Sequence, residues 1–352
     1  MAAALALASR TRGATTPNPN VGCVIVREGR VVGRGWTQAG GRPHAEAMAL
    51  AEAGDRAKGA TAYVTLEPCA HVSPRGPACA DLLAASGVAR VVAALGDPDP
   101  RTDGTGFARL SEAGIAVSTG VLADEARRSM AGFLIRRALG RPHVTLKLAL
   151  SLDGAVSMAD GRSRWITGPV ARAHTHLERS RHDAILVGRG TWETDRPRLN
   201  VRLPGLESRS PLRVVLSSKP PLKGEGDRPK GGGGVAPRGN LSSPSTPPSA
   251  LQAATSPCRG GLIHITHPTA VATLPADHLF VEGGARTAAA FLNAGLIDRL
   301  LLYRAPIVIG GGRTLPDIGL GALAEAHGRW RLVDARALGS DRLEVYEAAR
   351  EA

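Results

Sequence analysis

The amino-acid sequence predicts an α/β protein built in two parts, and three observations support this. Short apolar runs with strand character alternate with helix-length segments along the chain. The length of 352 residues exceeds that of a typical single domain. The turn signal Gly140-Arg141-Pro142 precedes a fresh apolar strand. We therefore expect one domain over residues 1–140 and a second over residues 141–352.

The first part is expected to begin with a core-facing helix over residues 2–9, where alanine and leucine dominate. Apolar runs rich in β-branched residues predict strands at 21–26, 62–66 and 91–95. Between and after these strands, the apolar spacing predicts helices at 44–53, 80–85 and 124–139. This order predicts helices packed on a sheet.

The second part repeats the alternation. Apolar runs predict strands at 143–150, 184–187, 213–216, 262–266, 279–281 and 300–303. Thr167-Gly168-Pro169 is expected to open a helix, with the threonine as its cap and proline in the first turn. A second helix is expected over residues 285–294. Residues 219–260 hold eight prolines and a four-glycine run, so we expect a disordered insertion there.

The composition favours a small-molecule partner over nucleic acid. The net charge is +13, but 39 of the 44 basic residues are arginines scattered along the chain rather than gathered in a basic run. Aromatic residues make up 3%, too few to stack many bases. Scattered arginines suit phosphorylated small molecules instead.

The apolar pattern predicts no membrane partner. The sequence contains no apolar run of 18 residues or more. The first residues are apolar but lack the leading basic residues of a secretory signal. We therefore expect a cytoplasmic protein.

His44-Ala45-Glu46 and the later Pro68-Cys69 with Cys79 form the residue set of a hydrolytic zinc site. Three N and S ligands leave a fourth position for water, and Glu46 is placed to move its proton without binding the metal. His-x-Glu alone is common, and so is Pro-Cys. Their combination between strand–helix units favours Zn²⁺ held by His44, Cys69 and Cys79, with Glu46 as the catalytic residue.

The remaining cysteines and histidines carry less information. Four cysteines are too few for a disulfide framework in a chain of this size. Cys23 is expected in the core, and Cys258 in a polar loop. His71 remains an alternative ligand or a residue near the metal. His174 and His176, two apart on a predicted helix, are expected at the surface.

The second part contains Val281-Glu282-Gly283-Gly284 between a predicted strand and helix, and no Gly-x-Gly-x-x-Gly. Paired glycines at a helix start allow close approach of a phosphate. The same pattern also suits a plain helix-entry turn, and the residues alone leave both interpretations open.

The chain resembles the bifunctional deaminase/reductase family of riboflavin biosynthesis. In the first part the likeness rests on Pro17-Asn18-Pro19-Asn20-Val21-Gly22, His44-Ala45-Glu46-Ala47 and Thr65-Leu66-Glu67-Pro68-Cys69. In the second part it rests on 151–154, 163–168, 183–188, 281–284 and 301–306. Nine residues separate the two cysteines, one more than the spacing associated with the family.

The resemblance implies a cytidine-deaminase-like three-layer domain followed by a dihydrofolate-reductase-like α/β domain. It implies Zn²⁺ and NADPH as cofactors, and a phosphorylated pyrimidine as substrate. The first domain would deaminate 2,5-diamino-6-(5-phosphoribosylamino)pyrimidin-4-one, and the second would reduce the ribosyl chain to ribityl. A homo-oligomer is also implied.

Site residues follow from the resemblance position by position. The cofactor contacts implied are Trp165, Thr191, Asp195, Ser218 and Gly284. The substrate contacts implied are Asn18, Ser163, Arg179, Leu199, Arg202 and Glu282. Asp195 is the expected proton-transfer residue of the reduction, although an ordinary loop carboxylate fits the same position. His71 and Arg75 suit either the substrate or plain solvation.

Three alternatives remain at this point. The insertion directly after Ser218 would leave a deaminase alone if it impairs the reductase. The zinc motif also occurs in nucleic-acid deaminases, here with an accessory domain. A non-catalytic scaffold would hold a structural zinc. Such a site would require a fourth protein ligand and no free carboxylate nearby.

Overall fold

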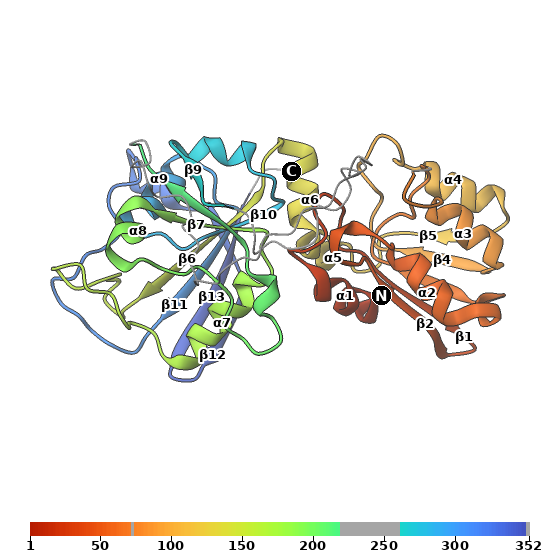
Figure 1. Cartoon of the computed structure of the whole chain (residues 1–352), viewed down its shortest axis with the longest axis horizontal. Helices are drawn as coiled ribbons and strands as arrows, with labels where there is room; N and C mark the ends of the chain where they lie inside the picture. Colours follow the sequence, from red (N-terminus) through yellow and green to blue (C-terminus); the bar gives the residue numbers. More distant parts are fainter. Residues whose placement is uncertain (72–73, 219–260, 350–352) are drawn as a thin grey trace, which may run out of the picture.

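The computed structural model describes residues 1–71, 74–218 and 261–349. Two separate sheets form within these residues, one built from residues 22–118 and one from residues 143–348. The two units lie side by side along the long axis of the molecule, with α5 and α6 near their junction (Figure 1). The expected insertion at 219–260 falls outside the described residues.

The first sheet has five strands in the order β2-β1-β3-β4-β5. β1 pairs antiparallel with β2 and β3, whereas β3, β4 and β5 run parallel. Its strands are β1 (Gly22–Arg27), β2 (Arg30–Trp36), β3 (Thr61–Val64), β4 (Arg90–Ala93) and β5 (Ala116–Ser118). The predicted strands are confirmed as β1, β3 and β4. The sequence prediction missed β2 and β5.

Helices cover both faces of this sheet at contact distance. A Cβ at Gly22 would collide with the backbone of Ala4 in α1 (Ala2–Ala8). On the opposite face, a Cβ at Gly33 or Gly35 would collide with the backbone of α2 (Ala45–Ala53). Glycine is therefore required for this spacing, and the expected three-layer arrangement is confirmed.

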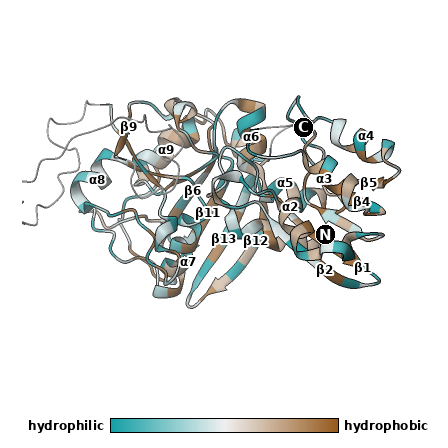
Figure 2. Cartoon of the chain, turned by 45° about the vertical axis from the view of Figure 1, so that its right-hand side comes forward, coloured by the Kyte–Doolittle hydropathy of each residue, from teal (hydrophilic) through white to brown (hydrophobic). Residues whose placement is uncertain are grey.

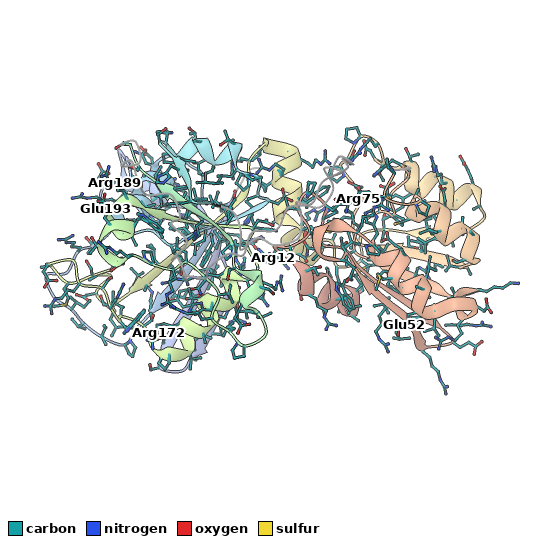
Figure 3. The ribbon with its side chains drawn as sticks, viewed as in Figure 1. Arg12, Glu52, Arg75, Arg172, Arg189 and Glu193 are labelled. Carbon is teal, nitrogen blue, oxygen red and sulfur yellow. The ribbon has the colours of Figure 1, made fainter. Side chains whose placement is uncertain are left out.

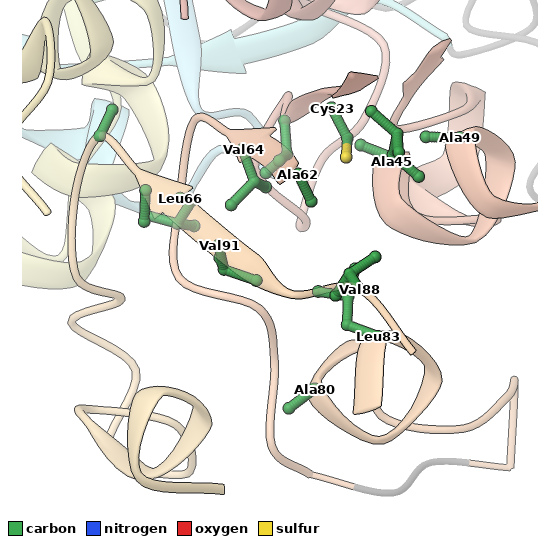
Figure 4. Packing of buried hydrophobic residues seen from close by; sticks show 14 of the residues in the cluster. Cys23, Ala45, Ala49, Ala62, Val64, Leu66, Ala80, Leu83, Val88 and Val91 are labelled. Carbon is green, nitrogen blue, oxygen red and sulfur yellow. The ribbon is translucent and has the colours of Figure 1, made fainter. Parts of the chain in front are cut away.

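The remaining helices of the first unit are α3 (Cys79–Ser86), α4 (Thr105–Glu112), α5 (Ala123–Ser129) and α6 (Ala131–Leu139). The single helix expected over 124–139 was wrong, because Met130 leaves helical geometry and separates α5 from α6. The core lies between the sheet and its helices, and includes Cys23, Val64, Leu66 and Leu83 (Figure 4). The burial of Cys23 was predicted.

The second sheet has eight strands in the order β12-β13-β11-β6-β10-β7-β8-β9. The six strands from β11 to β9 run parallel, and the β12–β13 hairpin joins them antiparallel at one edge. The strands are β6 (His143–Leu150), β7 (Ala184–Gly188), β8 (Leu212–Leu216), β9 (Ile263–Ile265), β10 (His278–Val281), β11 (Arg299–Arg304), β12 (Trp330–Leu338) and β13 (Asp341–Ala348). All six predicted strands are found, and the hairpin was missed.

Three helices accompany this sheet: α7 (Pro169–Arg179), α8 (Arg189–Asp195) and α9 (Ala285–Asn293). The prediction that Thr167 caps α7 was wrong. Gly168 is the N-cap residue, and its N–H donates to Asp341, while Pro169 begins the helix as expected. Two buried clusters, around Leu146 and Val281 and around Phe280 and Tyr303, form the core.

Among the described residues, short 3₁₀ turns also occur at Ser9–Thr11, Ala39–Gly41, Gly54–Ala57, Glu207–Arg209, Pro268–Thr273 and Leu323–Ala326. Apolar residues alternate with polar ones along many elements, as the mixed colours of α4 illustrate (Figure 2). Within the described residues, no helix combines the length and apolar character that a membrane crossing requires.

A partly buried hydrogen bond joins the two units. Thr16 donates to Asp183 Oδ1 at 2.7 Å, and Asp183 Oδ2 accepts the backbone N–H groups of Asp277 and His278. A Cβ at Gly132 of α6 would lie 2.5 Å from the ring of His278. His278 packs edge-on against both His143 and His182. The junction is therefore closely packed rather than a loose linker.

Candidate active sites

The first site gathers at the start of α2 and α3. His44 is the N-cap residue of α2, with extended backbone, and Pro43 precedes it. Cys79 is the first residue of α3. Cys69 lies in the loop between β3 and α3, directly after Glu67-Pro68. The start of α2, the start of α3 and the loop after β3 thus bring the three side chains together. The predicted cluster of His44, Cys69 and Cys79 is found.

The donor atoms fit a zinc ion. Nδ1 of His44 lies 3.3 Å from the Sγ of Cys79 and 3.6 Å from the Sγ of Cys69. All three donor atoms lie within 4.8 Å of one another. Tetrahedral zinc, with Zn–N and Zn–S bonds of about 2.0 and 2.3 Å, places its N and S donors about 3.6 Å apart. One nitrogen and two sulfurs leave one position open.

Asn18 contacts the far side of the same imidazole. Its side-chain amide lies 3.2 Å, measured at Nδ2, from Nε2 of His44. Nδ1 faces both sulfurs, so metal binding there requires the proton of the imidazole to sit on Nε2. Nε2–H must then donate, and a half-turn of the amide places the Asn18 Oδ1 as its acceptor.

Glu46 lies in the first turn of α2 and is buried, with 3% of its surface exposed. Burial raises the pKa of its carboxyl group, while His44 opposes this shift. The hydrogen bond from Cys79 lowers the pKa of Cys69 well below that of a free thiol. A thiolate is the form that binds metal.

A cavity of about 120 Å³ opens onto these residues. Asn18, His44, Glu46, Cys69 and His71 line it, together with Asp97, Asp99, Arg101 and Arg137 from the loop after β4 and from α6. His71 therefore lies in the cavity wall, while Arg75 donates to the backbone oxygen of Gly40 at 2.8 Å.

The sequence analysis missed the charged wall of this cavity. Arg101 and Arg137 both bind Asp99, at 2.6 and 2.9 Å, and hold its pKa below the usual range. Burial raises the pKa of Asp97 to about 6. The signal was present in the Asp97-Pro98-Asp99-Pro100 turn directly after a buried strand.

Glu67 is a buried carboxylate with a structural role. It accepts hydrogen bonds from the backbone N–H groups of Asp97, Gly104, Gly106 and Phe107. These contacts tie the loop of Cys69 to the start of α4.

The second site lies at the carboxyl ends of the parallel strands, where ligands bind in open α/β sheets. Glu282 follows β10 and Arg179 ends α7, and the two form a largely buried ion pair at 2.5 Å. Arg179 also donates to the backbone oxygen of Asn200 at 2.9 Å. Two predicted substrate residues are thus in direct contact.

Lys147 in β6 belongs to the same neighbourhood and was missed. Burial lowers the pKa of its amine, and the negative charge of Glu282 opposes that shift. Its Nζ lies 5.7 Å from the centre of the Tyr303 ring. A single lysine within an otherwise apolar strand was the signal available in the sequence.

The predicted cofactor residues lie on several elements of the second unit. A Cβ at Gly284, the N-cap residue of α9, would lie 3.6 Å from the hydroxyl of Thr191 in α8. Asp195 ends α8, and its Oδ1 lies 3.5 Å from the guanidinium of Arg164. Trp165 is 65% exposed, with Arg172 over its ring at 4.8 Å. Ser218 is the last residue described before the insertion.

The remaining predicted substrate residues are spread around this edge. Ser163 is exposed, whereas Leu199 is 2% exposed and adopts a positive φ of 53°. Arg202 contacts Nε2 of His176 at 3.2 Å. For Ser163 and Leu199 the structure gives position and burial only.

The surface positions expected for His174 and His176 were wrong. His174 is half-buried, and its Nδ1 lies 2.8 Å from the buried hydroxyl of Tyr303. His176 is also partly buried, and burial together with Arg179 lowers its pKa to about 4. His174 therefore faces Tyr303 of β11, whereas His176 faces Arg202.

Comparisons with known proteins cover both units. Residues 1–95 match the cytidine and deoxycytidylate deaminase zinc-binding region, and residues 142–343 match the RibD C-terminal domain. The riboflavin biosynthesis protein RibD of Escherichia coli is 42% identical over 359 residues, covering 97% of this chain and 96% of the relative. RibD of Aquifex aeolicus is 38% identical over 331 residues, covering 93% and 91%.

Solved structures agree over nearly the full length. RibD of Acinetobacter baumannii is 35% identical with a TM-score of 0.79, covering 99% of this chain and 98% of the other. A diaminohydroxyphosphoribosylaminopyrimidine deaminase/5-amino-6-(5-phosphoribosylamino)uracil reductase from Thermotoga maritima is 29% identical, also with a TM-score of 0.79. It covers 99% of this chain and 97% of the other.

Proposed function

The chain belongs to the RibD family of riboflavin biosynthesis, and from this premise we propose which of its residues carry the two reactions of the family. The protein is a bifunctional deaminase/reductase that uses zinc and NADPH and acts on a small pyrimidine substrate. It deaminates 2,5-diamino-6-(5-phosphoribosylamino)pyrimidin-4-one and reduces the ribosyl chain of the product. The matches favour this over a nucleic-acid deaminase or a deaminase alone.

The donor set of His44, Cys69 and Cys79 carries the assignment of the deamination site. These residues would hold zinc, which supplies a Lewis acid that activates water. Glu46 takes the proton from the attacking water and delivers it to the departing amine. Its burial suits this role, because a carboxyl with a raised pKa returns a proton readily.

Asn18 serves the same reaction in two ways. With the amide turned so that its oxygen faces the 3.2 Å contact, Asn18 accepts from Nε2–H of His44, and this fixes the ring with Nδ1 toward the sulfurs. Its NH₂ group then remains available to the cavity that it lines, where a pyrimidine carbonyl or ring nitrogen can accept from it. The role implied by the resemblance, a substrate contact, is thus joined by a positioning role.

The reductive half uses the carboxyl edge of the second sheet. NADPH supplies the hydride when bound. We assign its contacts to Trp165, Thr191, Asp195, Ser218 and Gly284, since the start of α9 presents N–H groups that suit a phosphate. Substrate contacts are assigned to Ser163, Arg179, Leu199, Arg202 and Glu282.

Asp195 is the proposed proton-transfer residue, and Glu282 is a second candidate. Asp195 is one-third exposed and faces Arg164, whereas Glu282 is buried against Arg179. Lys147 lies close enough to Glu282 for their charges to interact. We therefore assign Lys147 a hydrogen bond to the substrate beside the reacting chain.

The division at residue 140 separates the two reactions in this proposal. A homo-oligomer is proposed from the family, and exposed apolar residues of the second unit such as Val308 and Leu323 support it. A cytoplasmic location is proposed because a reducing compartment keeps the two thiol ligands available to metal.

One experiment tests the assignment as a whole. The purified enzyme is supplied with the diaminopyrimidine phosphoribosylamine substrate and NADPH, and ammonia release and NADPH oxidation are followed together. The expected result is ammonia first, with NADPH oxidation dependent on it. Ammonia release without any NADPH oxidation would contradict the reductive half.

A further inference from the structure

A groove of about 840 Å³ lies between the two units, and none of the residues assigned to either reaction lines it. One wall comes from α1, α5 and α6, and the other from β11, β12 and β13. His143 begins β6 and Arg299 begins β11, so the groove meets the second sheet at the amino ends of its parallel strands. The reductase site lies at the opposite, carboxyl ends.

The lining of the groove is rich in arginine, and its acidic residues are already paired. Four acidic residues and six arginines line it. Glu125 pairs with Arg128, Asp298 with Arg141, Asp334 with Arg336 and Glu347 with Arg331. None of these four ion pairs includes Arg12, Arg181 or Arg299.

Positive charge is in excess at that inner end, which we define as Arg12, Arg181 and Arg299. Arg181 and Arg299 share one buried carboxylate, Glu178, at 3.1 and 3.6 Å. Asp183 also lies near Arg12, but its oxygens accept from Thr16 and two backbone N–H groups. A fourth cation, Arg209, holds the carbonyl oxygens of Arg10 and Arg12.

Arg12 has donor capacity left. Among the residues that the structure describes, its buried Nε has no hydrogen-bond partner. Burial and the charge of Arg299 lower its pKa to about 10, so the guanidinium stays charged while its neighbours repel it. Arg12 lies at the junction of the two units (Figure 3). A bound anion would offset this repulsion.

We propose that the inner end of this groove binds the phosphate of a small phosphate monoester, at a third site separate from both catalytic pockets. Guanidinium groups suit phosphate because they present paired donors. The groove volume matches that of small-molecule sites. Leu5, Ile135 and Leu332 add apolar lining for the body of such a ligand. A ligand bound there touches both units and couples them.

The location is tested by diffraction from crystals of the full chain soaked in sodium tungstate, a tetrahedral dianion with strong anomalous scattering. The expected result is a peak between Arg12, Arg181 and Arg299. Peaks confined to the two catalytic pockets, or no peak, would overturn the proposal. Neither outcome depends on catalytic activity, so the proposed function is tested independently.

The ligand class is tested by calorimetric titration with ribose 5-phosphate, inorganic phosphate and ribose. Ribose 5-phosphate and inorganic phosphate are expected to bind at this site, and ribose is not. Tighter binding of ribose 5-phosphate than of inorganic phosphate would identify a phosphate ester as the preferred ligand. Arg181→Gln should weaken phosphate binding there about tenfold, since a charged hydrogen bond is lost. Arg34→Gln removes the same charge from the exposed β2 pair with Glu52 and should change nothing. Equal weakening in both variants would contradict a local site.

Discussion

The amide of Asn18 and Nε2 of His44 lie 3.2 Å apart, on the side of the imidazole that faces away from both cysteines. The ring is therefore held between one polar contact and two sulfurs. This arrangement ties the loop before β1 to the start of α2, and it links a proposed metal ligand to a second residue of the cavity wall.

Asn18→Leu should lower zinc affinity about 10- to 100-fold, because an outer partner that fixes a ligating histidine is removed. Competition with a chromophoric chelator measures this directly. Asn18→Asp keeps an acceptor for Nε2–H and should retain zinc. Loss of zinc by both variants alike would show that packing, not the hydrogen bond, is responsible.

Glu46→Gln should retain zinc but slow ammonia release about 10²- to 10⁴-fold, since an amide cannot shuttle the proton. Elemental analysis gives the metal content, and an ammonia assay gives the rate. Glu52→Gln, at an exposed position of the same helix, is the matched control. Undiminished turnover in Glu46→Gln would rule out the shuttle.

Cys69→Ser should strip most of the zinc, because a hydroxyl is a poor replacement for a thiolate. Cys23→Ser is the control, since Cys23 is buried in β1 and is not one of the three clustered donors. Full zinc occupancy in purified Cys69→Ser protein would contradict the ligand assignment.

Lys147→Met and Asp195→Asn should each slow NADPH oxidation while leaving ammonia release unchanged, because both lie in the second unit. The kcat of the two variants also distinguishes a residue that binds the substrate from a residue that transfers the proton. Asp195→Asn should reduce kcat most if this carboxyl moves the proton, whereas a normal kcat would shift the role to Glu282. Equal loss of deamination would contradict separate sites.

Acid should weaken the junction between the units. Burial lowers the pKa of His143 and of His182 to about 3, and that of His278 well below its ordinary value. The unfolded chain therefore binds more protons than the folded one between pH 3 and 6.5, so stability falls as pH drops through this window. Each histidine contributes about 1.4 kcal/mol per pH unit.

Thermal unfolding measured from pH 8 to pH 4 checks this expectation. The melting temperature should be steady above pH 7 and should decline below about pH 6.5. The variant His143→Gln should decline less steeply. An unchanged slope in that variant would show that other groups, such as carboxylates, govern the acid response.

Most parallel strands and the metal donors could be predicted because their signals are local. Buried strands leave continuous apolar runs, and His44, Cys69 and Cys79 stand in short motifs. The hairpin of β12 and β13 was missed because β12 is largely exposed at the sheet edge and carries arginines among its apolar residues. The break at Met130 was missed because apolar spacing continues across it.

The missed site residues depend on contacts distant in sequence. Lys147 gains significance only when β10 brings Glu282 beside β6. Asp99 is paired with Arg137, 38 residues further along the chain. His174 was predicted at the surface because its contact, Tyr303, lies in a strand far along the chain. Residue type and spacing alone carry none of this information.

The tight seating of α2 on Gly33 and Gly35 has a consequence for interpreting variants. His44 sits at the first turn of that helix, while its two sulfur partners arise from other segments. Adding a single methyl to Gly35 would lift the helix and carry the imidazole away from the thiols. Such a variant would lose metal even though none of the metal ligands has been substituted.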